Sequence, residues 1–382
     1  MKNPFKYGEL STGENFCNRK QEIKRLQSAF RDGQSIVIIS PRRWGKSSLV
    51  NRSVDTFKGK LICIQIDCFG ISSSREFYAA FLKATLQQTN SKLQQVVDTV
   101  TKLLKSLVPY VKYGVSENDE IQISLDLPNK KYDVEDILEL PQRIAIDRKA
   151  RLVFCIDEFQ KIAEWQDGKM VLEKLRSYWQ NHNQVSYCLY GSKRHVMSTL
   201  FAHSSQPFYR FGEILFLNKI EAYEWTAFLV KEFEQTSKTI SVETANRLAE
   251  LVDSHSYFVQ YLARICWNNS DKKVTNEILD SSFNELLNDH LSLFQNQTRS
   301  LTKYQVNYLK AVSAGETQLT SQRVLNQFDL GSPGNIKRNQ DVFEDLEILD
   351  YATSTPKFCD PYFKPLFDRI FKDPNLHENS AH

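Results

Sequence analysis

The chain contains 382 residues, 41% hydrophobic and 25% charged, with a formal net charge of +3, which is typical of a globular protein with two or three domains. Its seven scattered cysteines include no Cys-x-x-Cys pair, which excludes a disulfide framework and a zinc site. No signal peptide opens the chain and no apolar run reaches membrane-spanning length, so we expect a soluble, cytoplasmic protein without a membrane partner.

The first sixty residues are strongly basic. They contain 13 Lys or Arg against 5 Asp or Glu. A positive field at this end of the chain attracts a polyphosphate. A solvated basic surface explains part of the surplus equally well.

A short β-branched run is followed by a helical pattern. Ile36–Ile39 predicts a strand that is buried on both faces. Apolar residues at helical spacing follow from Leu49 to Phe57. The segment between them joins a strand to a helix, where free N–H groups at the helix start bind an anion.

This segment matches the P-loop pattern Gly-x4-Gly-Lys-[Ser/Thr] except that Ser40 replaces the first Gly. Gly45 lets the backbone curl around a β-phosphate, Lys46 reaches the β- and γ-phosphates, and Ser47 offers its hydroxyl to Mg²⁺. For an isolated Gly-Lys-Ser, an ordinary solvated loop is an equal alternative. The remaining candidates for binding the nucleotide here are Ser40, Pro41, Arg42, Arg43, Trp44 and Ser48.

Arg42 and Arg43 exceed what a phosphate cradle requires. One hypothesis is that at least one of them pairs with an acid on the carboxyl-terminal lid or winged helix, or with the nucleotide of a neighbouring subunit, and so reports the occupancy of the loop. The alternative is that both steer phosphate from solvent.

The next strand prediction is 61–66, and 151–158 is an apolar run that ends in two acids. Asp157 is predicted to hold Mg²⁺ through water, and Glu158 to polarise the attacking water. Two solvated acids after a strand are common by themselves, but with the P-loop they indicate ATP and Mg²⁺ binding. The run is a candidate for the strand that neighbours the P-loop strand.

Strands are also predicted at 185–190 and 213–217. Their alternation with helices indicates a parallel three-layer α/β core with the nucleotide at the carboxyl ends of its strands. An insertion at about 91–135 carries a helical pattern from 93 to 108 and a β-hairpin from 110 to 127, around a turn at 116–119. It is either a partner-binding surface or a decoration of the core.

The carboxyl-terminal half is predicted to be mainly helical. Helices are expected at 222–233, 242–254, 257–267 and 278–287, and then at 302–313, 321–328 and 335–347. Short strands at 350–351 and 357–359 complete a winged-helix pattern over 301–371. Residues 377–382 are predicted to belong to a disordered tail.

The stretch from Pro41 to Leu49 resembles the P-loop of the archaeal-type ATPases of the STAND/AAA+ group, P-loop NTPases related to replication initiators of the origin-recognition type. The resemblance covers most of the chain. It implies an ATPase core at 1–219, a helical lid at 220–290, a winged helix at 291–372 and a tail at 373–382.

Further residues carry functions only through this resemblance. Asn3-Pro4-Phe5 and Phe16-x-x-Arg19 resemble family elements that line the adenine pocket. Ser192, after the fourth strand, matches a residue that senses the γ-phosphate, and a small turn residue is the alternative. Arg210 matches an arginine that touches the γ-phosphate in cis or in trans, and a surface arginine is the alternative.

The winged helix leaves two functions open. Four residues at the start of its third helix stand where a DNA reader contacts bases: Asn335, Lys337, Arg338 and Asn339. However, 301–372 contains 9 basic and 9 acidic residues, whereas DNA binding usually rests on a basic excess. The first hypothesis is an ATP-driven switch with a protein partner or a homo-oligomer, and the alternative is a DNA-binding initiator or transposition helper.

Overall fold

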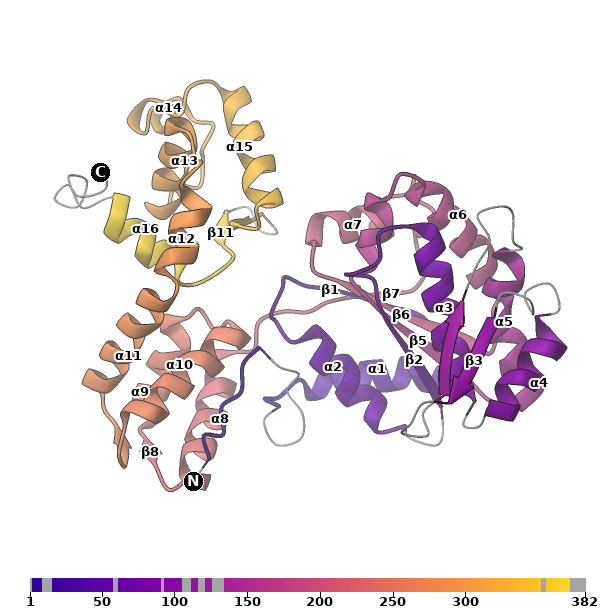
Figure 1. Ribbon diagram of the computed structural model, residues 1–382. Coiled ribbons are helices and arrows are strands. Elements are labelled where there is room, and N and C mark those ends of the chain that lie inside the picture. The colour runs from indigo at the N-terminus through magenta and orange to yellow at the C-terminus, as the bar shows by residue number, and fades with distance from the viewer. Residues whose placement is uncertain are drawn as a thin grey trace. The chain divides into compact units, whose positions relative to one another are not determined.

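The computed structural model describes residues 2–8, 16–57, 61–90, 93–104, 111–115, 121–125, 134–351 and 355–371. The chain forms two compact units (Figure 1). We call Arg19–Asn218 the α/β unit, and Met1–Asn18 together with Lys219–His382 the helical unit. The described residues 2–8 and 16–18 therefore belong to the same unit as the carboxyl-terminal half, whereas we had assigned 1–219 to the ATPase core.

The α/β unit contains a five-stranded parallel sheet, as predicted, in the order β2-β5-β6-β1-β7. The strand that ends in the two acids does not neighbour the P-loop strand, because β6 lies between them. The chain passes from β1 to the edge strand β2, and β5 and β6 later occupy the two positions between them. The strands are β1 (Ile36–Ile39), β2 (Ile62–Asp67), β5 (Leu152–Asp157), β6 (Val185–Gly191) and β7 (Glu213–Phe216).

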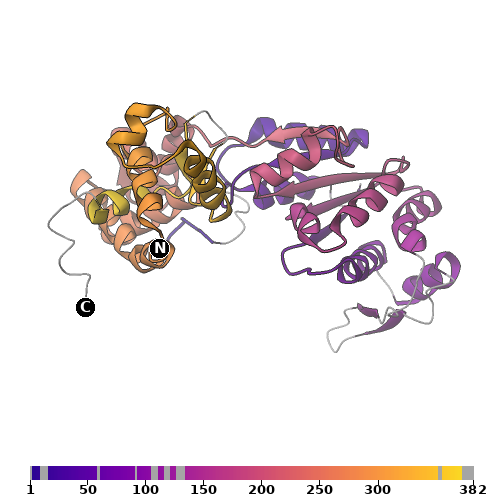
Figure 2. The ribbon, with the colours of Figure 1, turned by 90° about the horizontal axis from the view of Figure 1, so that it is seen from above.

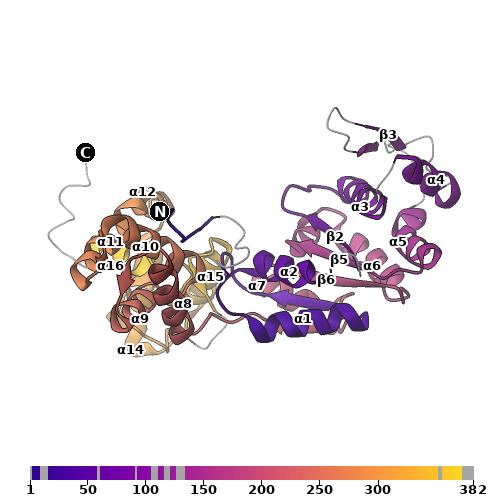
Figure 3. The ribbon, with the colours of Figure 1, turned by 90° about the horizontal axis from the view of Figure 1, so that it is seen from below.

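Helices cover both faces of this sheet, because every residue of β1 and β6 is buried. Figure 3 shows α1 and α2 together on one face. The other face packs on apolar residues of α3, α5, α6 and α7. These helices are α1 (Lys20–Asp32), α2 (Lys46–Asp55), α3 (Ser74–Thr89), α5 (Val134–Arg148), α6 (Gly168–Trp179) and α7 (Arg194–Ala202).

The predicted insertion contains a helix and an antiparallel ribbon. These are α4 (Leu93–Leu103), β3 (Val111–Val115) and β4 (Ile121–Leu125). Figure 2 shows the ribbon apart from the central sheet and beside α4. The predicted turn at 116–119 lies outside the described residues.

The first half of the helical unit contains the four predicted helices. They are α8 (Ala222–Gln235), α9 (Val242–Leu251), α10 (Ser256–Asn269) and α11 (Asn276–Asp289), with the small parallel pair β8 (Thr239–Ile240) and β9 (Lys273–Val274). Helix α9 ends before the predicted Ser254. Asp253 and Ser254 adopt left-handed backbone angles, with φ of 50° and 51°, which cannot continue a right-handed helix.

The second half has the winged helix-turn-helix arrangement. It contains α13 (Lys303–Ser313), α14 (Gln322–Gln327), α15 (Pro333–Asp345), β10 (Leu349–Asp350) and β11 (Lys357–Phe358), and two helices that we had not predicted, α12 (Leu291–Thr298) and α16 (Phe363–Phe371). The predicted tail at 373–382 lies outside the described residues. In the described part of the chain, no helix is long and apolar enough to cross a membrane.

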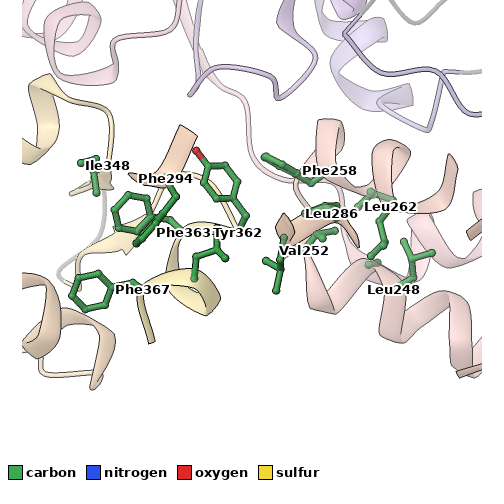
Figure 4. Packing of buried hydrophobic residues seen from close by; sticks show 14 of the residues in the cluster. Leu248, Val252, Phe258, Leu262, Leu286, Phe294, Ile348, Tyr362, Phe363 and Phe367 are labelled. Carbon is green, nitrogen blue, oxygen red and sulfur yellow. The ribbon is translucent and has the colours of Figure 1, made fainter. Parts of the chain in front are cut away.

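The two halves of the helical unit share one hydrophobic core. Figure 4 shows Tyr362 among side chains from both halves. The Tyr362 ring lies 5.6 Å from the Phe258 ring of α10 and stacks on His290 at 4.6 Å. Phe294 of α12 packs edge-on against Phe363, with ring centroids 4.9 Å apart. Continuous aromatic packing of this kind favours movement of the lid and winged helix as one body.

Candidate functional site

The loop between β1 and α2 is shaped to surround an anion. Arg43 and Gly45 have left-handed backbone angles, with φ of 62° and 91°. A backbone in which left-handed and other conformations alternate turns its successive N–H groups toward a common point, where they can bind an anion. Helix α2 begins at Lys46 without a side-chain cap, and the N–H groups at a helix start point toward an anion such as a phosphate.

The Lys46 side chain lies inside this loop and is only 6% exposed. Its Nζ donates to the carbonyl oxygens of Ser40 at 3.2 Å and of Pro41 at 3.0 Å. Ser40 itself is fully buried and contributes through its backbone. This backbone role is consistent with a serine in place of the first glycine of the pattern.

Ser47 and Asp157 form an oxygen pair at the carboxyl edge of the sheet. The Ser47 hydroxyl donates to Asp157 Oδ2 at 2.7 Å. Burial raises the Asp157 pKa from 3.8 to about 6, against the opposing effects of the Ser47 hydrogen bond and the Lys46 charge. Mg²⁺ prefers hard oxygen ligands, commonly one carboxylate together with waters and phosphate oxygens, so this pair fits the ion.

We predict that Asp157→Asn stabilises the nucleotide-free protein above pH 7 and weakens Mg²⁺-dependent nucleotide binding. A raised folded-state pKa contributes stability below 3.8 that is lost as the pH rises through about 6, so the ionised carboxylate is unfavourable at neutral pH. The melting temperature should rise by a few degrees, on the order of 1 kcal/mol. A lower melting temperature at pH 7.5 in calorimetry would contradict this.

Glu158 is held at the end of β5 in a left-handed conformation, with φ of 51°. Its Oε2 accepts hydrogen bonds from the Ser192 hydroxyl at 2.8 Å, from the Ser192 N–H at 3.4 Å and from Gln160 Nε2. The candidate general base and the candidate γ-phosphate sensor, predicted separately, are therefore in direct contact.

The additional residues of the P-loop make contacts within the α/β unit. Arg42 Nε donates to Ser192 Oγ at 3.4 Å. The Trp44 ring lies under the Arg194 guanidinium, 6.0 Å from its carbon. The contact of Arg42 with Ser192 joins the phosphate loop to the end of β6. The hypothesis that Arg42 or Arg43 pairs with an acid on the lid or winged helix, or with the nucleotide of a neighbouring subunit, stays a prediction.

Arg19 connects the phosphate loop to the segment that follows β7. It is 4% exposed and precedes α1 with a left-handed φ of 64°. Its guanidinium donates to the carbonyl oxygens of Asn218 at 2.6 Å and Trp44 at 3.2 Å, and to Glu22 at 3.1 Å. These three acceptors support a role in positioning the loop, and a place for Arg19 at the adenine pocket stays a prediction.

We predict that Arg19→Ala destabilises the protein, because it removes a buried guanidinium that donates to three acceptors. The expected loss is about 2 kcal/mol, or roughly 4–8 °C in melting temperature. Arg25→Ala is the matched control, since Arg25 lies on α1, the helix that follows Arg19, in an exposed pair with Glu213 and should change stability by at most about 1 kcal/mol. Equal melting temperatures of the two variants would contradict the assignment.

The Asn3-Pro4-Phe5 segment belongs to the helical unit. The Asn3 amide donates to the Arg264 carbonyl at 3.1 Å and to Asn268 at 2.9 Å. The Phe5 ring is fully buried and packs 4.9 Å from Phe233. Phe5 is thus a core residue of the helical unit, and its place in an adenine pocket stays a prediction. Pro4 and Phe16 are partly exposed and remain predictions.

Arg210 is exposed, and the structure does not bring it into the phosphate loop. Its guanidinium lies over the ring of its neighbour Tyr209, 5.1 Å from the centroid. A contact in trans with a second subunit remains a prediction.

The predicted DNA-contacting residues differ in exposure. Asn339 is only 7% exposed, so it faces the interior, which weighs against its assignment to a DNA-reading surface. Lys337 is exposed but pairs with Asp341 on the same helix at 2.6 Å. Arg338 is exposed and Asn335 is partly exposed. The face presented by α15 therefore carries less available positive charge than the sequence indicated.

One residue of the site was absent from the sequence predictions. Gln160 lies two residues after Glu158 and is 1% exposed. Its Oε1 is buried without a hydrogen-bond partner among the described residues, which costs about 1–3 kcal/mol. The available signal was an uncharged polar residue next to apolar Phe159, directly after the two acids.

Comparison with known proteins agrees with this geometry. Residues 30–196 match the family model of an AAA domain. Among curated proteins, none matches the sequence. A Walker-type ATPase of Pyrococcus abyssi is similar in structure, with a TM-score of 0.65, 14% identity and coverage of 95% of this chain and 99% of that chain. The ORC2 protein of Aeropyrum pernix, solved in ADPNP–ADP complexes, has a TM-score of 0.56, 14% identity and coverage of 96% and 98%.

Both solved structures share the fold over nearly the whole chain, including the helical unit. The family match contains the phosphate loop, the two acids of β5 and Ser192. Residues 30–196 therefore match an AAA domain, and this chain has the α/β fold of the P-loop NTPases.

Proposed function

We propose that this protein binds ATP with Mg²⁺ at the carboxyl edge of its sheet and hydrolyses the γ-phosphate. Lys46 and the amides at the start of α2 bind the β- and γ-phosphates. Ser47 and Asp157 hold the metal, which when bound neutralises phosphate charge. Glu158 accepts a proton from the attacking water, and Ser192 senses the γ-phosphate.

The observation that carries this proposal is the meeting of three distant segments. The phosphate loop, the end of β5 and the end of β6 are linked by two contacts, Ser47 with Asp157 and Glu158 with Ser192. Phosphoryl transfer requires cation binding, anion binding and a base in one place. A purely structural role for these residues would not explain why a lysine, two acids and a serine gather around the start of α2.

We further propose that nucleotide occupancy is transmitted to the helical unit. Arg19 contacts Trp44 of the loop and Asn218, the last residue of the α/β unit. A loop that moves on binding nucleotide therefore pulls on the segment through which the chain leaves this unit. The output is then a change in how the helical unit is presented to a protein partner or a second copy of the chain.

Duplex DNA is the less favoured partner. The balanced charge of residues 301–372 and the inward-facing Asn339 both weaken a DNA-reading surface on α15. Exposed Arg338 keeps this alternative testable.

A nucleotide-binding titration, a turnover assay and a gel shift test the proposal together. We expect fluorescent ADP and ATP to bind in the presence of Mg²⁺, and phosphate release to exceed the blank. We also expect any shift of duplex DNA to be weak and to disappear as salt rises to 200 mM, with or without ATP. Absence of nucleotide binding would reject the function. A tight, ATP-dependent DNA shift at 200 mM salt would favour the initiator-type alternative.

A further inference from the structure

We propose that Gln160 is a positioning residue that fixes the Glu158 carboxylate for catalysis. This inference rests on the proposed ATPase activity and assigns one of its requirements to a residue outside the phosphate loop. Gln160 lies on the 3-10 helix η3 (Phe159–Glu164), which begins directly after Glu158. This turn directs the Gln160 side chain back toward the Glu158 carboxylate.

The hydrogen bonds distinguish the two carboxylate oxygens of Glu158. Gln160 Nε2 and both donors of Ser192 reach the same oxygen, Oε2. Within the described residues, Oε1 is thus the oxygen left to accept a proton from water. A carboxylate held through one oxygen presents the other in a fixed direction, which a general base requires.

The orientation of the Gln160 amide follows from this contact. A reversed amide would place its oxygen against the Glu158 carboxylate, so the nitrogen must face Glu158. The amide oxygen then points into the protein and has no hydrogen-bond partner among the described residues. An apolar side chain of the same size avoids that loss, so packing alone does not account for a glutamine here.

The neighbouring strand leaves space for this amide. A Cβ on Gly191, the last residue of β6, would overlap the Gln160 amide oxygen and lie 2.9 Å from its Cδ. Gly191 has no left-handed backbone angle that would require a glycine. The close approach of Gln160 is therefore the reason for a glycine at this point, directly before Ser192.

The role of Gln160 in the chemical step can be tested separately from nucleotide binding, because different residues are assigned to the two functions. The phosphates and metal are assigned to Lys46, Ser47 and Asp157, and none of the hydrogen bonds of Gln160 goes to these three. Loss of the Gln160 donor should therefore slow the chemical step and leave nucleotide affinity unchanged. Residues that orient a reacting group from behind typically contribute about 10–100-fold.

Gln160→Met tests the inference, because methionine has nearly the same length and removes both the donor and the unpaired oxygen. We expect single-turnover ATP hydrolysis to fall at least about tenfold. The Kd for ATP should stay within about threefold, and the melting temperature should be equal to or higher than that of wild type. Gln142→Met is the matched control, since Gln142 is also buried in the α/β unit but bonds Asn183 and Gln184, away from Glu158.

Gly191→Ala provides an independent route, because it displaces the same amide without changing Gln160. It should reproduce the slow turnover with ATP affinity retained. Wild-type turnover in Gln160→Met, or an equal loss in Gln142→Met, would overturn the positioning role while leaving the ATPase proposal intact. Absence of hydrolysis in the wild type would instead reject the catalytic part of the proposed function, and this inference with it.

Discussion

Lys46→Ala is expected to weaken ATP binding by about two orders of magnitude, while the protein remains folded. The buried ammonium lies between loop carbonyls that a bound phosphate would face. Removal of one partner from a buried charge pair costs about 3 kcal/mol, which corresponds to roughly a hundredfold in Kd. Alanine favours the first helical turn, so α2 should persist. Titration with a fluorescent ATP analogue in the presence of Mg²⁺ measures the change.

Arg52→Ala is the control for this variant, because it removes one positive charge from an exposed site near the end of the same helix. It should leave affinity within about twofold at physiological salt, where exposed charges are screened. Equal effects of the two substitutions would mean that the loop attracts phosphate only through its general positive field. Unchanged affinity in Lys46→Ala would remove the loop from the binding site.

The phosphate loop and the two acids could be predicted because their chemistry depends on residues adjacent in sequence. Four β-branched residues specify β1, and the Gly45-Lys46-Ser47 run requires a helix start after it. The parallel sheet followed from the alternation of strands and helices. Local patterns of this kind depend on residues that are close in sequence, so they can be interpreted without knowing how the rest of the chain packs.

The order of the strands could not be predicted, because β5 and β6 come later in the sequence and yet lie between β1 and β2 in the sheet. The burial of Phe5 and Asn339 likewise depends on packing partners that are distant in sequence. Gln160 was missed for the same reason, since its importance arises from Gly191 on a strand about thirty residues away in the chain. Sequence periodicity indicates which face of an element is buried, but not what it meets there.

Arg42 and Trp44 of the phosphate loop make contacts that explain what the sequence left open about them. Arg42 reaches the end of β6, and Trp44 offers its ring to Arg194 and its carbonyl to Arg19. The phosphate loop is therefore connected both to the end of β6 and to the residue that precedes α1. Movement of such a loop on nucleotide binding affects Ser192 and Arg19 together, which favours a coupled response over simple steering of phosphate.

Glu158→Gln is expected to slow ATP hydrolysis at least about a hundredfold and to leave ATP affinity within about threefold. An amide cannot take the proton of the attacking water, and loss of a general base typically costs about 10²–10⁴-fold. Glutamine retains an oxygen that accepts from Ser192 and Gln160, so the local packing should persist. Phosphate release at saturating ATP, together with a separate binding titration, resolves the two quantities.

Glu164→Gln is the matched control, because Glu164 lies on the following 3-10 helix and pairs with Lys161 at 2.8 Å and Lys193 at 2.7 Å. The same chemical change there should leave hydrolysis within about twofold, since exposed ion pairs contribute little. If Glu158→Gln and wild type hydrolyse ATP at equal rates, Glu158 is not the base. If both variants lose activity equally, the effect comes from the negative charge of this segment, and the proton acceptor must be sought elsewhere at the carboxyl edge of the sheet.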